Sequence, residues 1–194
     1  GWECWYYVGT SVPEDVTLTL SGMDNCRVFE KETAGNWDSM FWRFEAASNP
    51  EVEVLISRDA DSRLNHREKA ADEWLNHPQA DFHIMRDHPW HTTEILGGMW
   101  GARGDVVKHM AKWIKAFLFS IESSGSNYWQ VDQDFLKQVI YPKVKEEAFV
   151  NDSGVYEYEP FPTLRKEKYF VGQAFDEHDN PLHPEHMDMI VENF

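Results

Sequence analysis

The stretch that decides the fold of this chain is Glu51-Val-Glu-Val-Leu-Ile-Ser-Arg-Asp-Ala-Asp-Ser-Arg-Leu64. Its first half is rich in β-branched and aliphatic residues, a pattern that predicts a short buried strand. The strand ends in two carboxylates one residue apart, Asp59 and Asp61, which alternate with Arg58 and Arg63. Because open α/β sheets bind ligands at the carboxyl ends of their strands, we expect these four side chains to line a crevice.

This mixture of charges suits a divalent cation and a phosphate group. Two carboxylates supply hard oxygen ligands for Mn²⁺ or Mg²⁺ and leave coordination positions open for phosphate oxygens. Arginine side chains bind such oxygens through paired N–H groups. A solvated acidic turn after a strand is the alternative, and an Asp-x-Asp pattern alone does not separate the two.

The composition indicates one acidic domain. A chain of 194 residues is long enough for a single domain with a buried core. Its formal net charge of −16, from 34 acids against 18 Lys and Arg, disfavours nucleic acid or an anionic membrane as the main partner. Cys4 and Cys26 are too few for a disulfide framework, so we expect reduced thiols in a cytoplasmic protein. No transmembrane run or signal peptide is visible.

The spacing of apolar residues predicts alternating strands and helices, and hence an α/β domain with a mixed, mostly parallel central sheet flanked by helices. Residues 1–176 form this domain, and 177–194 are expected to be a loose acidic extension. Asn151-Asp-Ser-Gly154 is interpreted as a turn. The expected strands are 4–8, 26–29, 52–57 and 81–86, and the expected helices are 11–20, 38–47, 67–75, 106–121 and 135–141.

Several polar residues outside the acidic strand end are further candidates. Arg43 is the one basic residue of an apolar helix, where a surface salt bridge is the simpler interpretation. Asp87 and His88 follow the strand 81–86 and can act as a base or a metal ligand, although most such residues are hydrogen-bonded loop groups. Gly97 and Gly98 permit close approach of the backbone to a ligand, or form a plain tight turn. Each of these alternatives is open at this stage.

The order of these features resembles the GT-A-fold nucleotide-sugar glycosyltransferases, in particular small bacterial and chlorovirus-type enzymes, and more distantly the retaining galactosyltransferase-like family. The resemblance covers roughly residues 2–176. Its most specific parts are Arg58 to Arg63 and the block His83-Ile-Met-Arg-Asp-His-Pro-Trp-His91. A protein of this kind from a virus is expected in the host cytoplasm.

The resemblance implies roles for individual residues. It implies that Asp59 and Asp61 ligate Mn²⁺ (or Mg²⁺) together with the donor diphosphate, and that Arg43 lies near the donor phosphates. It places Asp132 and Gln133 beside the reacting face of the sugar. The expected partners are a nucleoside-diphosphate sugar, with a UDP-sugar favoured, and a glycan or glycoprotein acceptor.

Two departures from the family pattern stand out. The fold usually begins with a strand that starts the nucleotide pocket, and we expect this chain to begin after it. A late histidine commonly supplies the third protein ligand of the metal, where the matching turn here offers Asn151 and Asp152.

The expected reaction is transfer of a sugar to a hydroxyl group. An inverting enzyme needs a base, for which Asp87 or His88 is the candidate, and a retaining enzyme would use Asp132 or Gln133 beneath the oxocarbenium-like centre. Two other functions remain open. One is a metal-dependent phosphohydrolase with Asp59 as nucleophile, and the other is a non-catalytic glycan- or nucleotide-binding domain.

Overall fold

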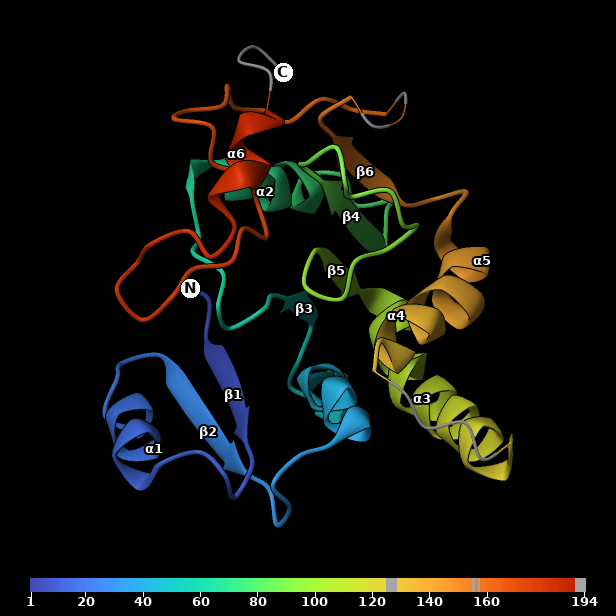
Figure 1. Ribbon diagram of the computed structural model, residues 1–194. Coiled ribbons are helices and arrows are strands. Elements are labelled where there is room, and N and C mark those ends of the chain that lie inside the picture. Colours follow the sequence, from blue (N-terminus) through green and yellow to red (C-terminus); the bar gives the residue numbers. More distant parts are fainter. Residues whose placement is uncertain (125–128, 155, 157, 191–194) are drawn as a thin grey trace.

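The computed structural model describes residues 1–124, 129–154, 156 and 158–190 (Figure 1). The described strands are β1 (Cys4–Val8), β2 (Cys26–Glu30), β3 (Val54–Ser57), β4 (Phe82–Arg86), β5 (Trp100–Arg103) and β6 (Phe149–Asp152). The α-helices are α1 (Glu14–Ser21), α2 (Lys69–Leu75), α3 (Gly104–Ser124), α4 (Val131–Phe135), α5 (Tyr141–Val144) and α6 (Pro184–Asp188). The 3₁₀ helices are η1 (Trp37–Ser48) and η2 (His66–Glu68), and η3 (Leu136–Ile140) is a π-helix between α4 and α5.

The first thirty residues form the expected β-α-β unit. β1 and β2 pair in parallel, and α1 connects them. This pair is a sheet of its own, beside the larger one (Figure 1). Cys4 and Cys26 are register partners on these strands, and both are free thiols.

The larger sheet has the order β3-β5-β4-β6. β5 is antiparallel to both β3 and β4, and β6 is parallel to β4, so three of the four strands run in one direction. This confirms the predicted α/β class with a mixed, mostly parallel sheet. β6 was not expected, because Asn151 and Asp152 were interpreted as part of a turn; they are instead its last two residues.

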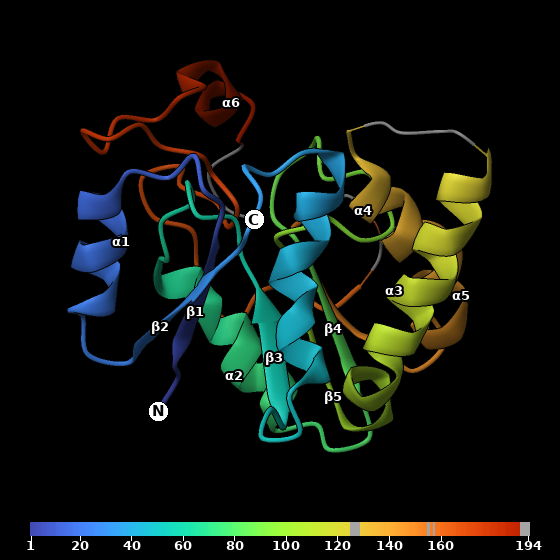
Figure 2. The ribbon, with the colours of Figure 1, turned by 90° about the horizontal axis from the view of Figure 1, so that it is seen from below.

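Helices cover both faces of this sheet. Successive side chains of β4 point to opposite faces and pack against these helices. Phe82 and Ile84 join the main core, in which η1 and α3 pack against the sheet. On the other face, the ring of His83 stacks on Trp74 of α2, 5.3 Å between centroids. Figure 2 shows η1, in light blue, and α3, in yellow, on the same side of the strands. All five β4 residues are buried as a result.

The helix predicted at 38–47 is a 3₁₀ helix that begins one residue earlier. Asn36 caps it by accepting a hydrogen bond from the Asp38 backbone N–H at 2.9 Å. The amphipathic helix predicted at 106–121 is confirmed as α3, with Met110 fully buried.

The segment after residue 176 is not loose. Its α6 lies over the loop after β4, where His88 Nε2 is 2.9 Å from the His186 carbonyl oxygen (Figure 1). Ile190 is 5% exposed. The last four residues of the predicted extension, 191–194, lie outside the described residues. Within the part of the chain that the structure describes, no helix combines the length and the apolar character needed to cross a membrane.

Candidate functional site

The structure brings Arg43 between two of the predicted acids. Its Nη1 donates to Asp59 Oδ1, and its Nη2 lies 3.4 Å from Asp132 Oδ2. The Arg43 side chain is 27% exposed, Asp59 is 44% exposed and Asp132 is 1% exposed. One guanidinium therefore joins an accessible carboxylate to a buried one.

Three separate elements position these groups. Arg43 projects from η1, where its Nε also donates to the Met40 carbonyl at 3.2 Å. Asp59 is the second residue after β3, as the sequence predicted. Asp132 is in the first turn of α4, which follows Gln130 with its left-handed φ of 75°. The helical segment expected over 135–141 therefore begins earlier, at Val131.

Gly97 and Gly98 lie against this trio. A Cβ on Gly97 would be 2.9 Å from Asp132 Oδ2, and a Cβ on Gly98 would overlap the Asp59 carboxylate. The loop is held in place because the Ser57 hydroxyl donates to the Gly97 carbonyl at 2.7 Å. These glycines are thus required for space beside the carboxylates of the protein itself.

Asp132 is the electrostatically unusual member. Within the described residues, neither of its carboxylate oxygens makes a hydrogen bond of ordinary geometry. Burial raises the pKa of Asp132 above its usual value, although Arg43 and the N–H groups at the helix start oppose the rise. A carboxyl group held in this way can take up a proton more readily than a solvated one.

The other predicted site residues differ in burial and in the partners they contact. Gln133, the neighbour of Asp132, is half-buried. Asp61 is exposed, and its carbonyl oxygen accepts from the Phe175 backbone N–H at 2.9 Å. Arg58 forms an ion pair with Glu68 of η2, in which Nη2 donates to Oε2 at 2.7 Å.

Arg63 likewise has a partner of its own. It pairs with Asp179 at 2.6 Å in the C-terminal segment. Among the described residues, the acidic partners of Arg58 and Arg63 are therefore not Asp59 or Asp132, but Arg58 Nη1 also donates to the Gly98 carbonyl oxygen at 3.5 Å.

The chain has a distant structural likeness to a known protein. No family model and no curated protein matches the chain. Among solved structures, the chain is similar to a glycosyltransferase involved in the glycosylation of the major capsid of PBCV-1. The identity is 15%, the TM-score is 0.47, and the match covers 77% of this chain and 81% of that chain. A likeness at this level carries no information about substrate or metal.

Asn151 and Asp152 are not beside the Asp-x-Asp motif, which corrects their expected role as metal ligands. β6 and β3 are the two edges of the four-stranded sheet, three strand spacings or about 14 Å apart. Asn151 is fully buried, where its Oδ1 is 2.8 Å from His83 Nε2 and its amide nitrogen donates to Glu73. Asp152 Oδ2 is 3.7 Å from Arg86 Nη1.

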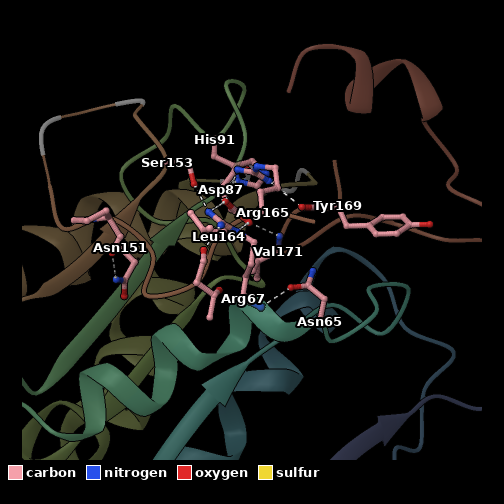
Figure 3. Close-up of polar contacts among 12 residues, drawn as sticks. Asn65, Arg67, Asp87, His91, Asn151, Ser153, Leu164, Arg165, Tyr169 and Val171 are labelled. Atoms are coloured by element: carbon pink, nitrogen blue, oxygen red, sulfur yellow. Dashed lines mark hydrogen bonds and ion pairs between the residues drawn. The ribbon is translucent and has the colours of Figure 1, made fainter. Parts of the chain in front are cut away.

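Asp87 is a buried structural anion, which corrects its expected role as a base. Arg67 donates to both of its oxygens, at 2.8 and 2.6 Å, and Arg165 donates to Oδ1 at 2.7 Å. The Ser153 hydroxyl and the Val171 backbone N–H supply two more hydrogen bonds, at 2.5 and 2.9 Å. Figure 3 shows these groups converging on the carboxylate. Its lone pairs are occupied, so it has none to offer a substrate hydroxyl.

His88 does not fit the role of a base either. Its Nε2 is 2.9 Å from the His186 carbonyl, and its Nδ1 accepts from the Trp90 backbone N–H at 3.1 Å. Burial lowers the pKa of His88. Both ring nitrogens are therefore used to hold the loop after β4.

Sequence reasoning missed the arginines that neutralise Asp87. Arg67 and Arg165 are 1% and 4% exposed, and they lie 20 and 78 residues from it in the chain. Arg67 is the first residue of the helix predicted at 67–75, and Arg165 lies outside every predicted helix and strand. The one available signal was that each arginine would need an acid if buried, which does not say which acid.

The residues present fit a divalent cation in part. Asp59 is accessible, Gly98 leaves room against its carboxylate, and Asp61 adds a second exposed oxygen donor. Among the described residues, the three potential ligands that lie within 4.8 Å of one another are His183, Glu185 and His186, in the C-terminal segment. Mn²⁺ or Mg²⁺ at Asp59 and Asp61 would thus draw its other ligands from substrate and water.

Proposed function

We propose that this protein is a metal-dependent glycosyltransferase of the GT-A type that transfers a sugar from a nucleoside-diphosphate sugar, with a UDP-sugar favoured, to a hydroxyl acceptor. The observation that carries the proposal is the convergence of Arg43, Asp59 and Asp132 around Gly97 and Gly98. These residues come from four separated segments, and the sequence resemblance had implied places beside the donor for Arg43, Asp59 and Asp132.

The side chains suit the charges that develop in such a reaction. Departure of a nucleoside diphosphate builds negative charge on a phosphate oxygen, and Arg43 can neutralise it through charge-assisted hydrogen bonds. A cation held by Asp59 and Asp61 would act there as a Lewis acid. The Asp132 carboxylate can stabilise positive charge on the sugar ring when ionised, with Gln133 beside it.

The test is a calorimetric titration of UDP and GDP with and without Mn²⁺. We expect micromolar binding of one nucleotide that requires Mn²⁺, and its loss in Asp59→Asn and in Asp61→Asn. Asp24→Asn, an exposed acid in the turn before β2, is the matched control and should bind like the wild type. Donor hydrolysis and transfer to simple sugars are then measured with the conjugates of the nucleotide that binds.

Other outcomes would point to other functions. Binding of neither nucleotide by folded protein would contradict the donor assignment. Phosphate release from simple esters that depends on Asp59 would favour a phosphohydrolase. Sugar binding without any metal requirement and without turnover would favour a binding domain.

A further inference from the structure

A second candidate site lies under the C-terminal segment. A partly open pocket of about 190 Å³ is lined by the loop after β4, residues 170–174 and the start of α6. Gln173 lines it and is only 3% exposed. Within the described residues, neither its Oε1 nor its Nε2 has a hydrogen-bond partner. A buried amide without partners is costly, so a polar ligand group that reached it through a small shift of the side chain would relieve that cost.

His91 adds a hydrogen-bond donor to the same pocket. Its Nδ1 accepts from the Asp87 backbone N–H at 3.0 Å, which leaves the proton of the neutral ring on Nε2. Burial lowers the pKa of His91 to about 3, so the ring is uncharged at neutral pH. The His91 donor and the Gln173 amide are both uncharged and suit the hydroxyl groups of a ligand, and His88, His183 and His186 also line the pocket.

Two aromatic side chains supply apolar surface. Phe170 is 4% exposed in the pocket wall, and Trp90 is 58% exposed at its edge. The Trp90 ring is fixed by an edge contact with the His186 ring, 4.6 Å between centroids. An aromatic face next to a few uncharged hydrogen-bonding groups matches a sugar, whose ring has apolar C–H faces and polar edges.

The pocket wall is continuous with the segment that holds Asp59. Ala174 forms a β-bridge with Ser62, three residues after Asp59. A Cβ on Gly172 would lie 2.7 Å from Met99 Sδ, and Met99 follows the glycine that packs on Asp59. The pocket wall and the segments next to Asp59 are therefore in direct contact.

We infer that this pocket binds one sugar ring of the acceptor. The inference rests on the proposed glycosyltransferase function, and it identifies the acceptor as a glycan or glycoside rather than a bare peptide or lipid. The volume supports a single ring, because pockets for drug-sized ligands begin at roughly 300 Å³. The residues that line the pocket do not include Arg43, Asp59 or Asp132, so donor and acceptor occupy different places.

The experiment follows NMR signals of isotopically labelled protein during titration with methyl glycosides, in the absence of donor and metal. The panel covers the gluco, galacto and manno configurations, a 6-deoxyhexose and a pentose, each up to 100 mM. We expect at least one glycoside to shift the Trp90 indole N–H and the Gln173 amide signals in a saturable manner. Trp90→Ala and Gln173→Met should each weaken that binding about tenfold. Trp2→Ala removes a similarly exposed tryptophan (51%) before β1 and should have no effect.

The outcomes separate this inference from the proposed function. If no glycoside shifts these signals, or if the two pocket variants bind as the wild type does, the sugar pocket is wrong. That holds even when the nucleotide binds with Mn²⁺. Sugar binding that is lost in both variants, together with failure to bind either nucleotide, would keep the pocket and contradict the glycosyltransferase. Trp90 is exposed, so its variant is informative even if Gln173→Met fails to fold.

Discussion

Arg67 and Asp87 form a bidentate ion pair inside the protein. Arg67 Nε donates to Asp87 Oδ2 at 2.8 Å, and Arg67 Nη2 donates to Asp87 Oδ1 at 2.6 Å. Both side chains are almost completely buried. Removing one partner of such a pair leaves an uncompensated charge where water cannot reach it. The pair therefore belongs to the stability of the fold rather than to its chemistry.

Asp87→Asn is expected to lower the free energy of unfolding by about 3–5 kcal/mol, because Arg67 and Arg165 would then face each other without a carboxylate. Urea denaturation of the variant and the wild type measures this difference in the free energy of unfolding. The control is Asp105→Asn, which breaks an exposed pair with Lys108 and should leave stability nearly unchanged. Equal effects of the two substitutions would contradict the buried role of Asp87.

Arg43→Lys is expected to weaken nucleotide binding in the presence of Mn²⁺ by about 10- to 100-fold, since one ammonium group cannot hold Asp59 and Asp132 in the way the guanidinium does. Calorimetry with the nucleotide measures the change. Arg27→Lys alters an exposed pair with Glu3 and is the control. Unchanged affinity in the Arg43 variant would remove this side chain from the donor site.

Gly98→Ala is expected to impair donor binding more than it impairs folding, because its Cβ would overlap the Asp59 carboxylate and lie 2.9 Å from the Asp59 backbone nitrogen. Nucleotide affinity and the midpoint of thermal unfolding are measured together. Gly22→Ala serves for comparison, since its Cβ would come no closer than 3.5 Å to any neighbour. Wild-type affinity in Gly98→Ala would mean that the Asp59 carboxylate is free to move.

The stability of the protein should fall as the pH drops below 6.5. Burial lowers the pKa of both His83 and His91 from 6.5 to about 3, so in this window the unfolded chain binds protons that the folded protein does not. Each histidine contributes a slope that approaches about 1.4 kcal/mol per pH unit. His91→Gln should reduce the slope by about that amount between pH 6.5 and 5, measured by urea unfolding. Parallel stability curves for the variant and the wild type would contradict the buried neutral state.

Much of the framework could be predicted from local patterns. β1, α1, β2, β4 and α3 are marked by apolar periodicity and by residues near their ends, and these signals act over a few positions. The Asp-x-Asp strand end was visible for the same reason. η1 was predicted as an ordinary helix, because its buried residues Phe41, Phe44 and Ala47 recur every three positions, a spacing that fits one face of either helix type.

What could not be predicted depends on contacts between distant parts of the chain. Asn151-Asp-Ser-Gly154 has the composition of a turn, yet Asn151 and Asp152 extend a strand that pairs with β4. Asp87 looked like a base because a carboxylate after a strand end is common in active sites. Its role is decided by two arginines that the sequence does not connect to it.

The partners of Asp87 also have a consequence for synthesis of the chain. The Val171 backbone N–H that completes its shell is encoded 84 residues after it. At translation rates of about 5–20 residues per second, that interval lasts roughly 4–17 s. During synthesis, Asp87 therefore lacks part of its set of partners until Val171 has been made. This side of the sheet can complete its hydrogen bonds only when most of the polypeptide has emerged from the ribosome.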